Sequence, residues 1–65
     1  MNHSSDSIYD VFPLLNAEQK VVVWLYYFEY LSEREIGDLL DRNRDRVHRI
    51  HRTALARMRS ALEAA

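Results

Sequence analysis

Arginine is the residue type that dominates the last third of this chain of 65 residues. Six of its eight arginines lie in the stretch NRDRVHRIHRTALARMR, from Asn43 to Arg59, although the formal net charge of the chain is −1. Guanidinium groups bind phosphate oxygens and can form two parallel hydrogen bonds with a guanine edge. Arginines concentrated in this way are typical of a surface that binds nucleic acid.

The charges of the two parts of the chain are opposite in sign. Residues 1–41 hold eight acids against Lys20 and Arg34, whereas residues 42–59 hold seven arginines against Asp45 alone. The alternative interpretation is a solvated helix face, but such faces normally mix both signs. The imbalance therefore favours a binding surface over a merely soluble one.

The elements that must position these arginines are predicted to be helices. One glycine and one proline leave little material for hairpin turns, and 65 residues have room for one small core. We expect an all-α fold of four short helices in a single domain over residues 1–65, with residues 1–7 as a disordered tail. The absence of cysteine excludes disulfides and thiolate metal sites. There is no signal-peptide core and no apolar run of about 18 residues, so a cytoplasmic location is expected.

The first helix is predicted from apolar spacing and is expected to be short. Ile8, Val11, Phe12 and Leu15 recur at helical intervals and share one face. Pro13 lies within this pattern and has no amide hydrogen, so it must end or distort the helix.

Two capping boxes predict the starts of the next two helices. In each box a polar side chain accepts from a backbone amide three residues later, and the later side chain reaches back. The two pairs are Asn16 with Gln19 and Ser32 with Glu35. They predict helices over residues 17 to about 30 and 33–40, the second of which should bury Ile36, Leu39 and Leu40.

The last helix is expected over residues 43–62, with Asn43 as its cap. At about 100° per residue, one side of this helix is apolar and the opposite side is charged. The apolar side comprises Val47, Ile50, Ala54, Met58 and Ala61. A tight turn between this helix and the preceding one makes a helix-turn-helix without a wing, whose second helix can enter a DNA major groove. Gly37, in the middle of a helix, indicates that another helix approaches closely there.

The residues quoted above resemble those of a known family. LNAEQKVVVWLYYFEYLSEREIGDLL followed by NRDRVHRIHRTALARMRSAL is similar to region 4 of sigma-70 family factors, the domain that recognises the promoter −35 element. The similarity runs from about Ile8 to Leu62. Its most specific parts are LSEREIG, the Arg-Asp-Arg-Val that opens the last helix, and the closing ALARMR.

The resemblance implies a sequence-specific, DNA-binding transcription factor. Its implied DNA-binding residues are Arg44, Asp45, Arg46, His48, Arg49 and Arg52. Arginine can donate two hydrogen bonds to guanine, at O6 and N7. A carboxylate at the helix start can accept a hydrogen bond from cytosine N4. The chain departs from the family at His48 and Arg49, where arginine and glutamine are usual, and at Tyr30 and Asp41, where glycine is common. We therefore expect a different base preference.

The resemblance also implies protein partners. Region 4 binds the β flap of RNA polymerase core through its N-terminal helices, and sigma-binding regulators compete for the same zone. Residues 21–28, VVVWLYYF, are apolar or aromatic on every side of a helix. Val21, Trp24 and Tyr26 stand where the family often has polar residues, and they are the predicted partner contacts. The alternative is that Pro13 folds the N-terminal segment over this face, which would then be core.

Two other functions remain open. The first is a dimeric helix-turn-helix regulator of the LuxR type, which shares the pattern of the helix over residues 33–40 but usually ends differently from ALARMR. The second is a sigma-mimicking interaction module, anti-sigma or co-sigma, that does not read DNA. Nothing resembles the sigma region that melts the −10 element, so we expect that this chain alone does not open a promoter.

No catalytic or cofactor site is predicted. His48 and His51 are spaced like metal ligands but lack a nearby third ligand, and they are expected to be a groove contact and a partly buried ring. No nucleophile with its base, and no pair of carboxylates in a pocket, can be recognised. We therefore expect neither an enzyme, a cofactor nor a metal.

Overall fold

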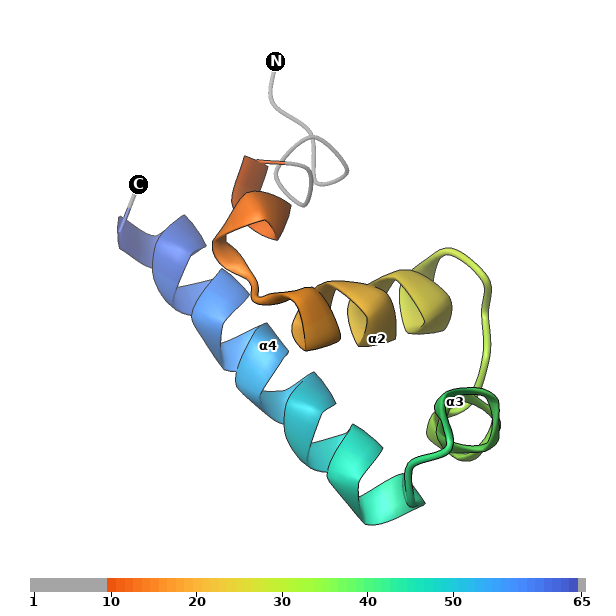
Figure 1. Cartoon of the computed structure of the whole chain (residues 1–65). Helices are drawn as coiled ribbons and strands as arrows, with labels where there is room; N and C mark the ends of the chain where they lie inside the picture. The colour runs from red at the N-terminus through yellow and green to blue at the C-terminus, as the bar shows by residue number, and fades with distance from the viewer. Residues whose placement is uncertain (1–9, 65) are drawn as a thin grey trace.

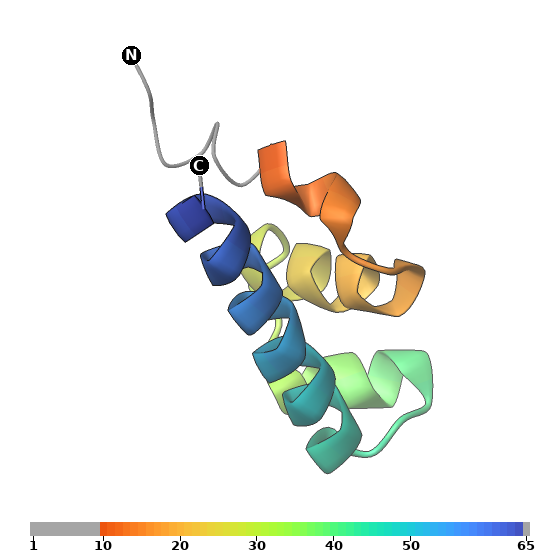
Figure 2. The ribbon, with the colours of Figure 1, turned by 90° about the vertical axis from the view of Figure 1, so that its left-hand side faces the viewer.

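The computed structural model describes residues 10–64 of the chain. Their elements are the one-turn 3-10 helix η1 (Phe12–Leu14) and the α-helices α2 (Ala17–Tyr27), α3 (Glu33–Leu40) and α4 (Arg44–Ala64). The long helix α4 runs the length of the molecule, and η1, α2 and α3 pack along one side of it (Figures 1 and 2). The fold is all-helical over the described residues, as expected, and the predicted tail over residues 1–7 lies outside them.

The prediction of four helices is wrong for the first of them. Asp10 and Val11 are helical, but the chain then tightens into η1 and becomes extended at Leu15. Pro13 lies in the first turn of η1, where its missing amide hydrogen prevents a continuing α-helix. Residues 10–64 therefore contain three α-helices. Val11 and Leu15 are buried as predicted, whereas Ile8 lies outside the described residues.

Helix α2 begins as predicted and ends about one turn early. Asn16 and Gln19 form the capping box, with hydrogen bonds of 2.8 and 3.0 Å. The helix ends at Tyr27 rather than near Tyr30, because Tyr30 has a left-handed backbone with φ 60°. This residue reverses the chain toward α3.

Helix α3 has the predicted bounds and the predicted capping box, in which Ser32 and Glu35 exchange hydrogen bonds of 3.1 and 2.8 Å. The prediction that Leu39 is buried is wrong, because its side chain is 63% exposed. Ile36 and Gly37 are buried and Leu40 is half-buried, so the packed side of α3 is turned toward Gly37. The backbone that follows α3 packs against this glycine.

The core consists of two clusters that both include α2 and α4. Val22, Ile36 and Val47 join α2, α3 and the start of α4. The second cluster packs the residues on either side of η1 against α2 and the later part of α4. It consists of Val11, Leu15, Val23, Ala54 and Met58. The predicted apolar stripe of α4 is thus confirmed, with Ile50 and Ala61 half-buried at its edges. No helix within residues 10–64 is long and apolar enough to cross a membrane.

Candidate nucleic-acid interface

The turn between α3 and α4 holds the two helices in a helix-turn-helix. Asp41 ends α3 in the left-handed conformation, with φ 59°, and Asn43 caps α4 by accepting a 2.8 Å hydrogen bond from the amide of Arg46. A Cβ atom on Gly37 would lie 2.6 Å from the carbonyl oxygen of Arg42. The close approach predicted at Gly37 is therefore present, although the approaching backbone is the turn rather than a helix.

Tyr30 and Asp41 are the non-glycine residues with positive φ within residues 10–64. Both stand where the sequence departs from the glycine that is common in the family. A left-handed backbone is costly for a residue with a side chain, and less so for aspartate than for tyrosine. The departures thus retain the backbone conformation that glycine would adopt.

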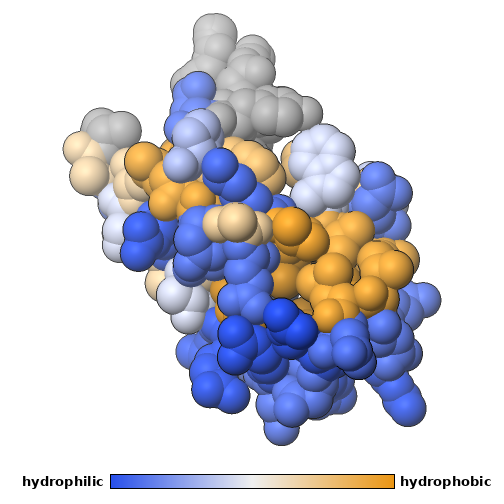
Figure 3. All heavy atoms as spheres, viewed as in Figure 1, coloured by the Kyte–Doolittle hydropathy of each residue, from blue (hydrophilic) through white to orange (hydrophobic). Residues whose placement is uncertain are grey.

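The predicted DNA-binding residues all lie on the exposed side of α4, near its start. They are Arg44, Asp45, Arg46, His48, Arg49 and Arg52, and each is exposed. The opposite side of the same turns is buried in the core through Val47 and Ala54. In Figure 3 hydrophilic side chains cover the region of α3 and the start of α4, whereas hydrophobic ones gather over α2.

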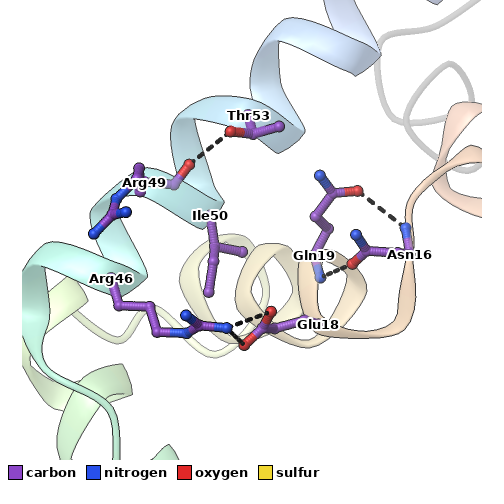
Figure 4. A pocket seen from close by; sticks show the side chains of 7 residues that line it. All are labelled: Asn16, Glu18, Gln19, Arg46, Arg49, Ile50 and Thr53. Carbon is purple, nitrogen blue, oxygen red and sulfur yellow. Dashed lines mark hydrogen bonds and ion pairs between the residues drawn. The ribbon is translucent and has the colours of Figure 1, made fainter.

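The side chains of these residues differ in what they contact. Those of Arg44, Arg49 and Arg52 make no hydrogen bond or ion pair with other described residues. Arg46 reaches across to α2, where its terminal nitrogen donates to both carboxylate oxygens of Glu18 at 3.4 and 3.3 Å. Figure 4 shows this contact, with the guanidinium of Arg49 pointing away from Glu18.

A surface depression of about 180 Å³ separates α4 from the start of α2 at this point. Its lining combines the cap of α2 with the basic side of α4, and comprises Asn16, Glu18, Gln19, Arg46, Arg49, Ile50 and Thr53. Arg42 from the preceding turn approaches the same carboxylate, with its Nε 3.7 Å from Glu18 Oε2. Arg42 and Arg46 are thus both paired inside the domain.

His48 and His51 contact a second acid, Glu33, at the start of α3. The Nδ1 atoms of His48 and His51 lie 3.0 and 2.8 Å from the two carboxylate oxygens. His51 is buried and its Nε2 lies 3.1 Å from the hydroxyl of Tyr27. With its proton on Nδ1, a neutral His51 donates to Glu33 and accepts from Tyr27. His51, for which a partly buried ring was the expectation, is therefore more deeply buried than expected.

The environment of this chain of hydrogen bonds changes two pKa values. Burial acts to raise the pKa of Glu33, but hydrogen bonds from His51 and His48 outweigh it, so that the pKa is lowered. Burial, together with the neighbouring Tyr26 and the charge of Glu33, raises the pKa of Tyr27. Glu33 therefore stays ionised and Tyr27 stays neutral around pH 7. Within residues 10–64, no group of three His, Asp or Glu side chains is arranged to hold a metal ion.

The three predicted partner contacts on α2 differ in their exposure. Trp24 and Val21 are 43% and 42% exposed, and they flank a shallow apolar depression with Phe12 and Leu25. Tyr26 is half-buried, with its ring 4.3 Å from that of His51. The alternative in which the N-terminal segment covers α2 holds in part. The rings of Phe12 and Trp24 are in edge contact, with their centroids 6.4 Å apart.

Sequence reasoning did not find the acids that hold the basic side chains, nor a groove near the end of α4. Glu18 contacts residues 24 and 28 positions away, and Glu33 contacts residues 15 and 18 positions away, so no local pattern marks either acid. The groove has a volume of about 370 Å³ and a largely apolar lining: Val11, Val23, Tyr27, Leu55, Met58, Arg59, Leu62 and Glu63. The spacing of Leu55 and Leu62, outside the apolar stripe, is the signal that could have revealed it.

Comparison with family models gives one match, which agrees with this geometry. The model described as Sigma-70, region 4, matches residues 12–60 and so covers η1, α2, α3 and most of α4. Comparison with curated proteins and with solved structures gives no match. Region 4 is a regulatory, non-catalytic domain that interacts in general with DNA and RNA polymerase. The chain belongs to the sigma-70 region 4 family and is a DNA-binding helix-turn-helix domain of the sigma-factor type.

Proposed function

We propose that this protein is a sequence-specific transcription factor that recognises a promoter −35-like element through the first turns of α4. The observation that carries the proposal is the exposed basic side of α4, which lies opposite the core on the second helix of a helix-turn-helix. In this arrangement a recognition helix inserts its N-terminal residues into the major groove. The proposal assigns the protein to the cytoplasm, in association with the nucleoid.

The roles of individual residues follow from their contacts. Arg44, Arg49 and Arg52 have guanidinium groups without a partner among the described residues, and these groups can bind guanine or phosphate. Asp45 lies in the first turn of α4, where the helix dipole favours a carboxylate. From there it can accept a hydrogen bond from cytosine N4. His48 is a further groove contact, held by Glu33.

The experiment selects preferred duplexes from a random library and measures affinity by fluorescence anisotropy at several salt concentrations. About five to seven phosphate contacts would make the logarithm of affinity fall with the logarithm of salt with a slope of roughly −4 to −6. Arg44→Ala and Arg49→Ala should each cost about 1 to 3 kcal/mol on the selected sequence and relax base preference.

The matched control is Arg57→Ala, farther along α4. Arg57 is exposed, and its guanidinium donates to the carbonyl oxygen of Leu14 at 3.4 Å. Its removal should weaken binding to all sequences alike or leave it unchanged. If the three variants lose affinity equally on selected and random DNA, α4 lies across the backbone and the proposed base recognition is wrong.

A second part of the proposal concerns protein partners, and the exposure of Trp24 and Val21 favours it. We propose that this face of α2 contacts the β flap of RNA polymerase core or a sigma-binding regulator. Aromatic side chains that are exposed in the free protein often dominate the energy of an interface. An interaction module that does not read DNA, or a homodimer of the LuxR type, would use the same apolar face.

Trp24→Ala tests the partner contact. The variant should remain folded, because the side chain is only partly buried, and it should bind polymerase core at least tenfold more weakly. Arg44→Ala is the matched control, since it should weaken DNA binding and leave polymerase binding unchanged. Analytical ultracentrifugation of the wild type and Trp24→Ala shows whether the face joins two copies instead. Normal binding of polymerase by the Trp24→Ala variant would contradict the proposed contact.

A further inference from the structure

Glu18 is an acid of α2 that pairs with two arginines at and just before the start of α4. Its carboxylate accepts from the terminal nitrogen of Arg46 at 3.3 Å and lies 3.7 Å from Nε of Arg42. All three side chains are between about one-third and one-half exposed. DNA phosphates can therefore reach both arginines, but each guanidinium already has the Glu18 carboxylate beside it.

The local structure holds the carboxylate in this position. Glu18 lies in the first turn of α2, two residues after the Asn16 cap. The dipole of α2 favours a negative charge at this position. The capping box fixes the start of the helix through hydrogen bonds in both directions. Glu18 and Arg46 meet in the lining of the surface depression between α2 and α4 (Figure 4).

We propose that Glu18 is an intramolecular competitor of DNA phosphate, which holds Arg42 and Arg46 in the free protein and limits the affinity for DNA. The proposal rests on the proposed DNA-binding function. It assigns a regulatory role to a residue of α2 that lies outside the recognition helix.

The physical reason is that one arginine cannot bind a phosphate and the carboxylate equally well at the same nitrogen. A phosphate that approaches Arg46 meets a like charge within hydrogen-bond distance of that nitrogen, so binding requires the carboxylate to be displaced. An arginine that is already neutralised by a carboxylate also adds little to counterion release from DNA. The competitor therefore lowers both the affinity and its dependence on salt.

The test compares wild type with Glu18→Gln, by anisotropy on the selected duplex over a range of salt concentrations. The variant should bind about three to ten times more tightly at low salt, and its salt slope should steepen by about 1 to 2, or roughly 0.9 for each arginine released. In an Arg42→Ala, Arg46→Ala background, Glu18→Gln should have no more effect than a distant change of charge.

The matched control is Glu29→Gln, which removes the same charge just beyond the other end of α2, where the side chain is exposed. It should change affinity less than twofold. Equal gains from both variants would mean a general charge effect and overturn the proposal. A loss of affinity in Glu18→Gln would also overturn it, because Glu18 would then position the arginines for DNA.

The outcomes also separate this proposal from the proposed function. If wild type binds DNA and Glu18→Gln binds identically, only the competition is wrong. If neither protein binds duplex DNA at low salt, the DNA-binding function fails and the competition fails with it. Binding by Glu18→Gln alone would support the competition in its strongest form. Circular dichroism of each variant confirms that the helices are retained.

Discussion

Two acids contact basic side chains of α4 and of the turn before it, and the two acids differ in their surroundings. Glu33 lies at the start of α3 and contacts one buried and one exposed histidine, within a hydrogen-bonded chain that ends at Tyr27. Glu18 lies at the start of α2 and contacts two arginines, all of them in solvent. Both acids use the first turn of a helix, where a carboxylate is favoured.

Burial accounts for the different roles that we expect for these two sets of contacts. Exposed pairs contribute little to stability, because water competes with both partners. A buried histidine with hydrogen bonds on both ring nitrogens is costly to remove, because its partners lose their hydrogen bonds. We infer that the Glu33 contacts hold α3 against α4, whereas the Glu18 contacts can exchange with a ligand.

The largest expected effect comes from His51→Ala. The ring is 6% exposed and bonds both Glu33 and Tyr27, so its loss should lower the free energy of unfolding by about 2 to 4 kcal/mol. Urea denaturation followed by circular dichroism measures this. The control is His48→Ala, which removes an exposed donor to the same carboxylate and should cost less than about 1 kcal/mol. Similar losses in both variants would remove the distinction between buried and exposed contacts.

Gly37→Ala tests the close approach between α3 and the turn that precedes α4. Its Cβ would be 2.6 Å from the carbonyl oxygen of Arg42, and backbone atoms cannot rotate away. We expect a loss of about 1 to 3 kcal/mol, despite the better helix propensity of alanine. The control is Asp38→Ala on the exposed side of α3, which should change stability by about 0.5 kcal/mol or less. Thermal unfolding that is unchanged in Gly37→Ala would show that the turn can relax.

Glu33→Gln should cost about 1 to 2 kcal/mol at pH 7, because glutamine is uncharged and has one acceptor oxygen, whereas the two carboxylate oxygens of Glu33 each contact a histidine. The folded-state pKa of Glu33 is lowered, so its contribution is fully present above the unfolded pKa, about 4.3, and is lost as pH falls through the folded pKa. The difference in stability between wild type and variant should therefore shrink below about pH 4. A difference that is the same at pH 7 and at pH 2 would contradict this assignment.

The smallest expected effect on stability is that of Glu18→Gln. Its partners are exposed, so the free energy of unfolding should change by about 0.5 kcal/mol or less. Compared with His51→Ala, Gly37→Ala and Glu33→Gln, however, Glu18→Gln should change the affinity for DNA the most. Chemical denaturation of this variant beside Glu33→Gln makes the comparison direct. A loss of stability as large as that of Glu33→Gln would mean that the Glu18 contacts are also structural.

Local sequence patterns predicted the elements well where the interactions are local. Both capping boxes join residues three positions apart, and they set the starts of α2 and α3 as expected. The end of α2 was predicted too late, because nothing adjacent to Tyr30 marks its left-handed backbone. The interruption expected at Pro13 is present, since the α-helical residues Asp10 and Val11 give way to η1 there, and the count of four helices fails at this first element.

Local spacing along the chain is enough to predict the helical class, the caps and the opposite apolar and basic sides of α4, because each depends on residues within a few turns of one another. The exposure of Leu39 and the groove near Leu55 and Leu62 depend on how the helices pack, and local spacing does not predict them. Helix packing also determines which acid contacts which basic side chain. Glu18 meets Arg46 across 28 residues, and the angle between two packed helices, rather than any sequence spacing, brings their charges together.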